Sequence, residues 1–292
     1  MSTVLSKGTL FPSELVSELF TKVKGKSSLV ALADQIPVAF NGNDIFTFAM
    51  DNEIAIVGEN EKKSHGGVTV DPVKVVPIKV EYGARVSDEF LYAAEEKQVE
   101  ILSAFADGFS KMVARGLDIM AMHGVNPRTG ETSNLINHYF DKNTTNVVNY
   151  DAAACDDNVE DAIAKIGDYD VTGIAMAKTF ASAMGKLENG NGGKLYPELS
   201  WGGQPNAING VRASVNSTVS FGASKDMAIV GDFANCFKWG YAKDIPMRVI
   251  EYGDPDNTGK DLQGYNQVYI RAEAYIGWAI LDEAAFARVV TA

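Results

Sequence analysis

Three histidines and two cysteines are the residues whose types could bind a metal or act as nucleophiles. His65, His123 and His138 are scattered, with no H-E-x-x-H motif and no pair four residues apart, so their spacing does not predict a metal site. Cys155 and Cys236 lie far apart without C-x-x-C spacing, which argues against a disulfide framework or a zinc knuckle. The sequence therefore predicts no metal site and no disulfide framework.

Three other stretches come close to catalytic or phosphate-binding motifs. Ser200 lacks the first glycine of a nucleophile elbow. A glycine-rich loop at 189–193 precedes Lys194, but Leu195 stands where a P-loop needs Ser or Thr, so we expect a surface turn there. Asp232 could serve a metal, but its position favours an N-cap of a following short helix. We expect no catalytic residue and no cofactor.

Composition and charge limit the class of protein. The chain has 292 residues, 46% of them hydrophobic and 22% charged, as in globular proteins with a substantial core. The net charge of -12 argues against a nucleic-acid-binding surface, and the basic cluster Lys22, Lys24 and Lys26 is typical of a solvated helix end. The N-terminus lacks the apolar core of a signal peptide, and no apolar run reaches membrane-spanning length, so we expect a protein made in the cytosol.

A long helix predicted over residues 87–124 dominates the elements that would position any site. Apolar residues recur there at spacings of three and four, the period of one helical face. Ser87 is a typical N-cap, and Asp88 and Glu89 place negative charge in the first turn. Gly124, followed by Pro127, ends the helix, and the stretch from Glu96 to His123 gives about 40 Å at about 1.5 Å per residue.

An amphipathic arm is predicted before this helix, at residues 10–32. Pro12 begins a helix with apolar residues on one side, Gly25 ends it, and Ser27 begins a second short turn. Nothing nearby in the sequence offers the apolar side of this arm a partner.

A long β-hairpin is predicted at 44–86. The outgoing runs are 45–48 and 54–57, the polar tip is 58–67, and the returning run is 68–80. Pro72 and Pro77 interrupt the returning run, and because proline removes a donor from the strand ladder, we expect this arm at a sheet edge. A two-stranded hairpin of this length needs a surface to lie on, which a second copy of the chain would provide.

Alternating short helices and strands after residue 158 predict an α/β module. A tight turn at 126–130 and a polar stretch through 149 come before it. The predicted helices are 159–166, 177–187 and a turn within 233–239. The predicted strands are 171–176, 208–215, 227–230, 247–251 and a strand or strand pair at 265–281, with a loop at 253–264 and a closing segment at 284–290.

Several short motifs follow one another along the chain. They are V-S-D-E-F-L at 86–91, D-x-x-x-x-x-G-x-N-P-x-x-G at 118–130, G-D-F at 231–233, R-A-E at 271–273 and A-F at 285–286. In this order and spacing they resemble the major capsid proteins of tailed bacteriophages, the Hong Kong 97 fold, over nearly the whole chain. The proline of the family's closing P-x-A-F is replaced here.

The resemblance implies an α+β fold of the Hong Kong 97 type, with an extended hairpin called the E-loop and a long spine helix. The implied parts are an N-terminal arm at 1–40, the E-loop at 41–84, a peripheral domain with the spine helix at 85–150, an α/β axial domain at 151–252, and at 253–292 a return strand to the peripheral domain followed by the C-terminal end of the axial domain.

In one branch of the family an E-loop lysine bonds to an asparagine of a neighbouring subunit, with a glutamate assisting. Residues 266–273 match that branch's N-x-x-x-x-R-x-E run, but its lysine position falls near Pro72 in this chain. Because of this departure we expect no cross-link and interpret Asn266 as a strand-edge residue. The candidates for the chemistry are Asn266, Glu273 and Lys74, with Lys62 and Lys63 at the hairpin tip.

The implied function is structural rather than enzymatic: self-assembly, through pentamers and hexamers, into the icosahedral shell around the double-stranded DNA of a tailed bacteriophage. The implied partners are other copies, a portal protein and packaged DNA bound without sequence specificity, with no membrane. Because the arm begins a few residues after Met1, we expect a separate scaffolding protein or unaided assembly. The implied location is the virion, and the host cytoplasm during assembly.

Two alternatives stay open at this stage. An encapsulin-type compartment shell resembles the same fold but encloses protein cargo, and a cargo-peptide groove would favour it. An α/β enzyme with an unrecognised site belongs to another class; turnover by a monomer would favour it, and the lack of His, Cys and Asp clusters in the sequence speaks against it.

Overall fold

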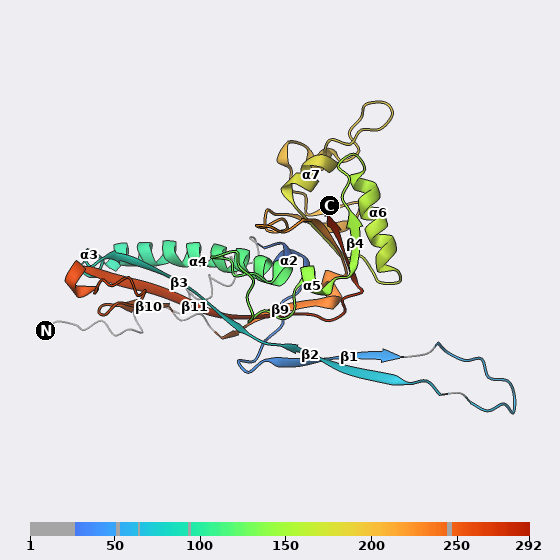
Figure 1. The fold of residues 1–292 in the computed structure, drawn as a ribbon, viewed down its shortest axis with the longest axis horizontal. Helices are drawn as coiled ribbons and strands as arrows, with labels where there is room; N and C mark the ends of the chain where they lie inside the picture. The colour runs from blue at the N-terminus through green and yellow to red at the C-terminus, as the bar shows by residue number, and fades with distance from the viewer. Residues whose placement is uncertain (1–26, 51–52, 64, 93–94, 244–246) are drawn as a thin grey trace.

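Two layers of secondary structure meet in the computed structural model of the chain, which describes residues 27–292 except 51–52, 64, 93–94 and 244–246 (Figure 1). The first layer holds the long helix and an antiparallel sheet. The second layer, a six-stranded sheet with its helices, stands at one end of the first, and a two-stranded hairpin projects away from the long helix at that end. The predicted arm helix from Pro12 and the basic cluster at 22–26 lie outside the described residues.

The long helix is α4, Glu95–His123, about 43 Å long at about 1.5 Å per residue. It begins later than the pattern predicts, because a separate turn, α3 (Glu89–Tyr92), precedes it. Its end is confirmed: Gly124 has a φ of 67°, and its amide donates to the Met120 carbonyl at 3.0 Å. A side chain at Gly124 would also collide with the Tyr139 ring, 2.6 Å from an added Cβ.

The sheet of the first layer is built on β11, Gln267–Ile280, a single strand of 14 residues. One edge of β11 pairs with β3 (Ile78–Ser87), and the other pairs with β10 (Met247–Ile250) and β9 (Phe237–Lys243). A short 3-10 turn, η2 (Gln263–Tyr265), leads into β11. Leu102 of α4 packs against Val268 and Ile270, so the helix covers this sheet.

The hairpin consists of β1 (Asn43–Met50) and β2 (Val68–Val75), paired antiparallel as a two-stranded sheet. The predicted outgoing run at 54–57 is wrong, because those residues form no strand. The predicted returning run at 68–80 divides between two sheets: β2 ends at Val75, and the chain from Ile78 pairs with β11 instead. Pro72 lies in β2, whose other edge carries no further strand among the described residues, as proline requires.

The second layer is a mixed six-stranded sheet with the strand order β4-β12-β8-β5-β7-β6. Its strands are β4 (Asn146–Asn149), β5 (Gly173–Met176), β6 (Ala207–Ile208), β7 (Val211–Val215), β8 (Asp226–Gly231) and β12 (Phe286–Val290). β4 and β12 are parallel, as are β5 and β7, and the other neighbours are antiparallel. All six residues of β8 are buried, as expected of a central strand.

Short helices surround this sheet: α2 (Ser28–Leu32), α5 (Phe140–Asn143), α6 (Cys155–Ile166), α7 (Lys178–Met184), η1 (Pro197–Gly202) and α8 (Phe233–Cys236). α6 contacts β4, β8 and β12, whereas α2 contacts β5, β7 and α4. An aromatic cluster closes the core where the layers meet, made of Phe140, Phe233, Phe237 and Phe286.

Several predicted elements differ from those in the structure. The apolar pattern at 208–215 predicts one strand, but the structure has β6 and β7 joined at Asn209-Gly210, which have φ of 49° and 87°. An Asn-Gly pair favours this two-residue turn, so the signal was in the sequence. In segment 233–239 only α8 is helical and β9 begins at Phe237. The polar stretch before 149 contains α5 and β4, and α6 begins at Cys155 rather than 159.

Candidate assembly surfaces

The cross-link candidates Lys74, Asn266 and Glu273 lie on different elements. Lys74 is exposed on β2 opposite Asp44, whereas Asn266 is exposed just before β11. Asn266 and Glu273 are roughly 20 Å apart, because the intervening strand extends about 3.3 Å per residue. The structure therefore does not bring Asn266 and Glu273 together within one chain.

Glu273 has partners of its own on the first-layer sheet. It is 9% exposed, and its carboxylate lies 3.0 Å from the Lys79 ammonium and 3.3 Å from Arg271 Nε. The hydrogen bond to Glu273 raises the pKa of Lys79. These contacts engage the Glu273 side chain within its own chain.

One face of the hairpin is apolar and exposed. Cross-strand pairs on that face are Phe46–Pro72, Phe48–Val70 and Met50–Val68. Phe46, Phe48 and Met50 are 67%, 62% and 75% exposed. In the part of the chain that the structure describes, this six-residue face, the ribbon face, is open to solvent.

The opposite face of the hairpin packs on its own chain near its base. Val75 is fully buried with Val38 and Ala279, and Ile45 and Val73 are half-buried against them. On this face Val75 is therefore covered by its own chain and is not available to a neighbouring copy. The ribbon face is the one left open.

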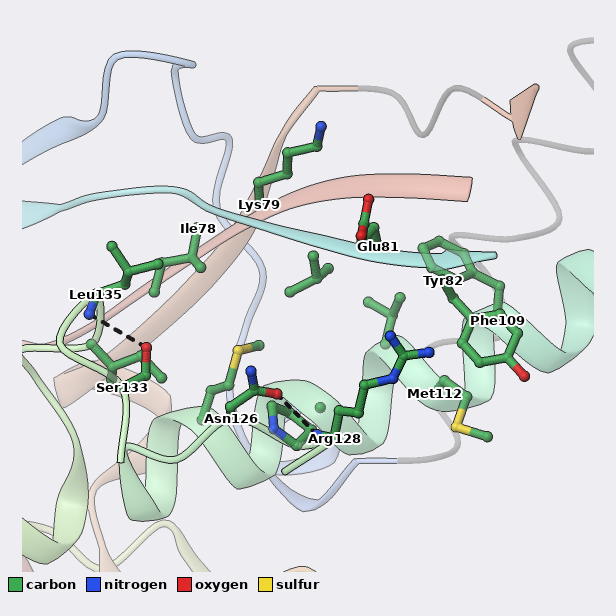
Figure 2. A pocket seen from close by; sticks show the side chains of 16 residues that line it. Ile78, Lys79, Glu81, Tyr82, Phe109, Met112, Asn126, Arg128, Ser133 and Leu135 are labelled. Carbon is green, nitrogen blue, oxygen red and sulfur yellow. Dashed lines mark hydrogen bonds between the residues drawn. The ribbon is translucent and has the colours of Figure 1, made fainter. Parts of the chain in front are cut away.

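A groove of about 410 Å³ lies between β3 and α4 (Figure 2). Met112, Leu135 and Tyr82 on its rim are 56%, 74% and 38% exposed. The loop after α4 shapes one wall, where Asn126 Oδ1 accepts from the Arg128 amide at 3.0 Å and Gly130 donates to the Asn126 carbonyl, which confirms the predicted turn at 126–130. The groove is an apolar recess beside an exposed arginine.

The arm segment Ser27–Leu32 has partners in its own chain, contrary to what the sequence suggests. Asp118 of α4 is fully buried, and its carboxylate accepts from the Ser27 hydroxyl and from the Ser28 and Leu29 amides at 2.9 and 3.1 Å. Burial raises the pKa of Asp118, although the hydrogen bonds from these donors lower it. The predicted short turn is confirmed as α2, with Ser27 as its N-cap, and its apolar side is buried.

An arginine of β3 fixes the loop at 253–264. Arg85 Nη2 donates to Asp254 Oδ1 at 2.7 Å, to Thr258 Oγ1 at 2.7 Å and to the Lys260 carbonyl at 2.9 Å. Arg85 also bonds to Asp256 and lowers the pKa of that carboxyl to about 2. The loop that leads into Asn266 is thus held against β3. The sequence predicted the loop but not its contact with Arg85, because Arg85 lies more than 160 residues earlier in the chain.

The three stretches that come close to catalytic or phosphate-binding motifs have structural roles. Asp232 accepts from the Asn235 amide at 3.2 Å, so its predicted N-cap role is confirmed. Gly193 donates to Asn189, which closes the predicted turn at 189–193. Ser200 donates to the Gly185 carbonyl at 3.2 Å and joins η1 to α7.

The chain is similar to capsid proteins of phages over nearly its whole length. The model of the phage capsid family matches residues 7–291. A solved structure from Mycobacterium phage Ogopogo is 33% identical with a TM-score of 0.78, covering 91% of this chain and 92% of that one. One from Gordonia phage Cozz is 23% identical, with a TM-score of 0.76 and coverage of 91% and 87%.

A third structure, titled as the capsid of a native GTA particle computed with C5 symmetry, is 17% identical with a TM-score of 0.66 and covers 100% of this chain and 94% of that one. No curated protein matches the chain. None of the described helices is long and apolar enough to cross a membrane. The α+β fold of the Hong Kong 97 type, expected from the motifs, is confirmed. The chain belongs to the phage capsid family.

Proposed function

We propose that this chain is the major capsid protein of a tailed bacteriophage and that its ribbon face is a principal contact between neighbouring copies in an icosahedral shell. The observation that carries the proposal is an exposed apolar face on a projecting hairpin: Phe46, Phe48 and Met50 are each more than 60% exposed and lie outside the hydrophobic core of the subunit. Burial of such side chains contributes roughly 1.5–3 kcal/mol each, and within a shell that energy favours assembly.

The groove between β3 and α4 of a second copy is the surface we propose for the ribbon face. The hairpin projects away from α4, so the ribbon face does not reach the groove of its own chain (Figure 1). The groove offers exposed apolar side chains, Met112 and Leu135 among them, at its rim.

Electron microscopy of the expressed chain tests shell formation. We expect closed shells from the wild type and soluble capsomers or monomers from a variant carrying Phe46→Ser and Phe48→Ser. A wild-type chain that stays monomeric at all protein and salt concentrations would contradict the capsid role. Shells formed equally well by the double variant would contradict only the role of the ribbon face.

Paired cysteines test the choice of groove. A chain carrying Phe48→Cys and Met112→Cys should form covalent multimers on oxidation after assembly. Each single variant is the matched control, because the buried Cys155 and the half-buried Cys236 are present in every sample. Monomeric double-variant shells after oxidation would show that the ribbon face lies elsewhere on its neighbour.

No covalent cross-link is proposed. Pro72 stands near the position of the family's lysine, Lys74 pairs along β2 with Asp44, and Glu273 is engaged by Lys79 and Arg271. Boiled wild-type shells should run as single subunits on a denaturing gel. A ladder of multimers abolished by Asn266→Asp would show that the candidates do react.

The remaining parts of the proposal rest on family membership. We propose that the division at 40, 84, 150 and 252 describes arm, E-loop, peripheral, axial and return parts. The proposed partners are other copies, a separate scaffolding protein, a portal and packaged double-stranded DNA; the proposed location is the virion, with assembly in the host cytoplasm. The relatives' titles name phages and a GTA capsid, which favours a phage shell over an encapsulin or an enzyme.

A further inference from the structure

Four charged or titratable side chains meet where the end of α4 contacts the second layer. His123 comes from α4, Asp141 from α5, Asp226 from β8 and Arg288 from β12. His123 Nδ1 lies 2.9 Å from Asp141 Oδ2, and Arg288 Nη1 lies 3.1 Å from Asp141 Oδ1 and 3.0 Å from Asp226 Oδ1. These residues, the joint cluster, link the long helix to three elements of the second layer.

The hydrogen-bond partners determine where protons lie in the joint cluster. His123 Nε2 is 2.8 Å from the Thr218 carbonyl, an acceptor only, so Nε2 carries a proton. The Asp141 and Asp226 carboxyl groups both contact Arg288 Nη1, and one oxygen of each lies within 4.8 Å of the other, so two ionised carboxylates would repel at this distance and a proton on one of them is favoured. Asp226 is 1% exposed, and no donor reaches its Oδ2 among the described residues. An ionised oxygen buried without a donor is costly, so Asp226 is the residue that holds the proton.

We propose that Asp226 and Asp141 share one proton at neutral pH and that this proton holds the joint between α4 and the six-stranded sheet together. With the proton present, Asp226 donates to Asp141, and Asp141 remains the single anion facing His123 and Arg288. Loss of the proton places two carboxylates side by side, one of them fully buried. The joint is then weakened where the two layers meet (Figure 1).

The electrostatics of the site support this assignment. Burial, followed by the nearby Asp141, raises the pKa of Asp226 to about 9, whereas the hydrogen bond with His123 and the charge of Arg288 hold the pKa of Asp141 below its usual value despite burial. A metal ion is disfavoured, because Arg288 already brings a positive charge to both carboxyl groups. The contact of 2.9 Å also leaves no gap between Nδ1 and Asp141.

The joint cluster continues to the arm through one residue. Thr218 is fully buried; its carbonyl accepts from His123, and its hydroxyl donates to Asp118 Oδ2 at 2.7 Å. Asp118 in turn holds the α2 segment by its Ser28 and Leu29 amides. A shift of Thr218 would therefore disturb both contacts, and weakening of the joint should loosen α2.

Urea unfolding of the full-length, unassembled chain between pH 5 and pH 10 tests the shared proton. Asp226→Asn has the shape and hydrogen-bond donor of the protonated acid, so it should leave stability at pH 5 near the wild-type value. The folded wild type keeps a proton that the unfolded chain releases. The ratio of wild-type to variant unfolding constants should therefore rise by up to tenfold per pH unit until about pH 9 and then level off.

Asp141→Asn is the matched second variant, because it removes the anion rather than the proton carrier. At pH 7 it should raise the unfolding constant at least tenfold and accelerate amide exchange at 28–32, whereas Asp226→Asn should do neither. Equal destabilisation by the two variants, or a pH-independent difference between Asp226→Asn and wild type, would overturn the proposal. So would stabilisation of the wild type by added Zn²⁺. Because unfolding does not require shells, these outcomes are independent of the capsid role.

Discussion

The hairpin and the six-stranded sheet are both β-structures rich in Val and Ile, yet they treat their apolar side chains differently. In β8 all six residues are buried by neighbouring strands and by α6 and α7. In β1 every second residue from Phe46 to Met50 is exposed, and the two-stranded hairpin has no second layer on that face within the described residues. The sheet stabilises the subunit, whereas the hairpin holds apolar surface that the described part of the chain leaves uncovered.

The sheet side of this comparison should show the largest loss of stability. Phe286 is fully buried, with ring centroids 5.0 Å from Phe140 and 5.2 Å from Phe233. Phe286→Ala should lower the free energy of unfolding by about 3–5 kcal/mol, because it leaves a cavity among rings that cannot all collapse. Urea titration measures this. Phe48→Ala in the hairpin is the control and should change the free energy of unfolding by no more than about 0.5 kcal/mol. Equal losses in the two variants would show that the hairpin face stabilises the subunit as much as the sheet does.

The contact between Asp118 and α2 should show the next largest effect. Asp118→Asn replaces one acceptor oxygen with an amide donor, so it turns a donor toward the Ser28 and Leu29 amides or the Thr218 hydroxyl. We expect a loss of about 2 kcal/mol and faster proteolysis next to Ser27. The exposed Asp71→Asn is the control. An unchanged cleavage rate in Asp118→Asn would show that α2 is held by its apolar side alone.

Deletion of the hairpin tip should separate folding from assembly. Residues 58–67, as far as they are described, are exposed, and they lie beyond the paired region of β1 and β2. Removing them and closing with a short turn should leave the melting temperature of the subunit unchanged and impair shell formation or stability. Calorimetry and electron microscopy measure the two effects. A variant that no longer folds would show that the tip contributes to the stability of the subunit and not only to assembly.

Charge reversal at the tip should have the smallest effect. Lys62 and Lys63 are exposed, and exposed ion pairs usually contribute no more than about 1 kcal/mol. Lys62→Glu with Lys63→Glu should leave the subunit unchanged and alter the salt dependence of assembly only slightly, as light scattering would show. Loss of shells at all salt concentrations would mean that the tip makes a buried charged contact.

Signals within a few residues of one another determined much of this protein from sequence. The helical period after residue 95, the glycine that ends α4, the Ser27 and Asp232 caps and most strands follow from local spacing and capping chemistry. Two wrong predictions also had local causes. The apolar run at 54–57 has no pairing partner and forms no strand, and the Asn-Gly turn within 208–215 was interpreted as part of one strand. The order of the motifs was enough to indicate the family.

Tertiary structure alone decided which apolar faces are covered and which charges meet. Val75 and Phe46 lie in the same hairpin with similar neighbours in sequence, but only Val75 finds Val38 and Ala279 beneath it. Asp118 gathers donors 90 and 100 residues away, and Arg288 meets Asp141 and Asp226 across three elements. No local period contains such contacts, because burial and partners over these separations depend on how the layers pack and not on the spacing of residues along the chain.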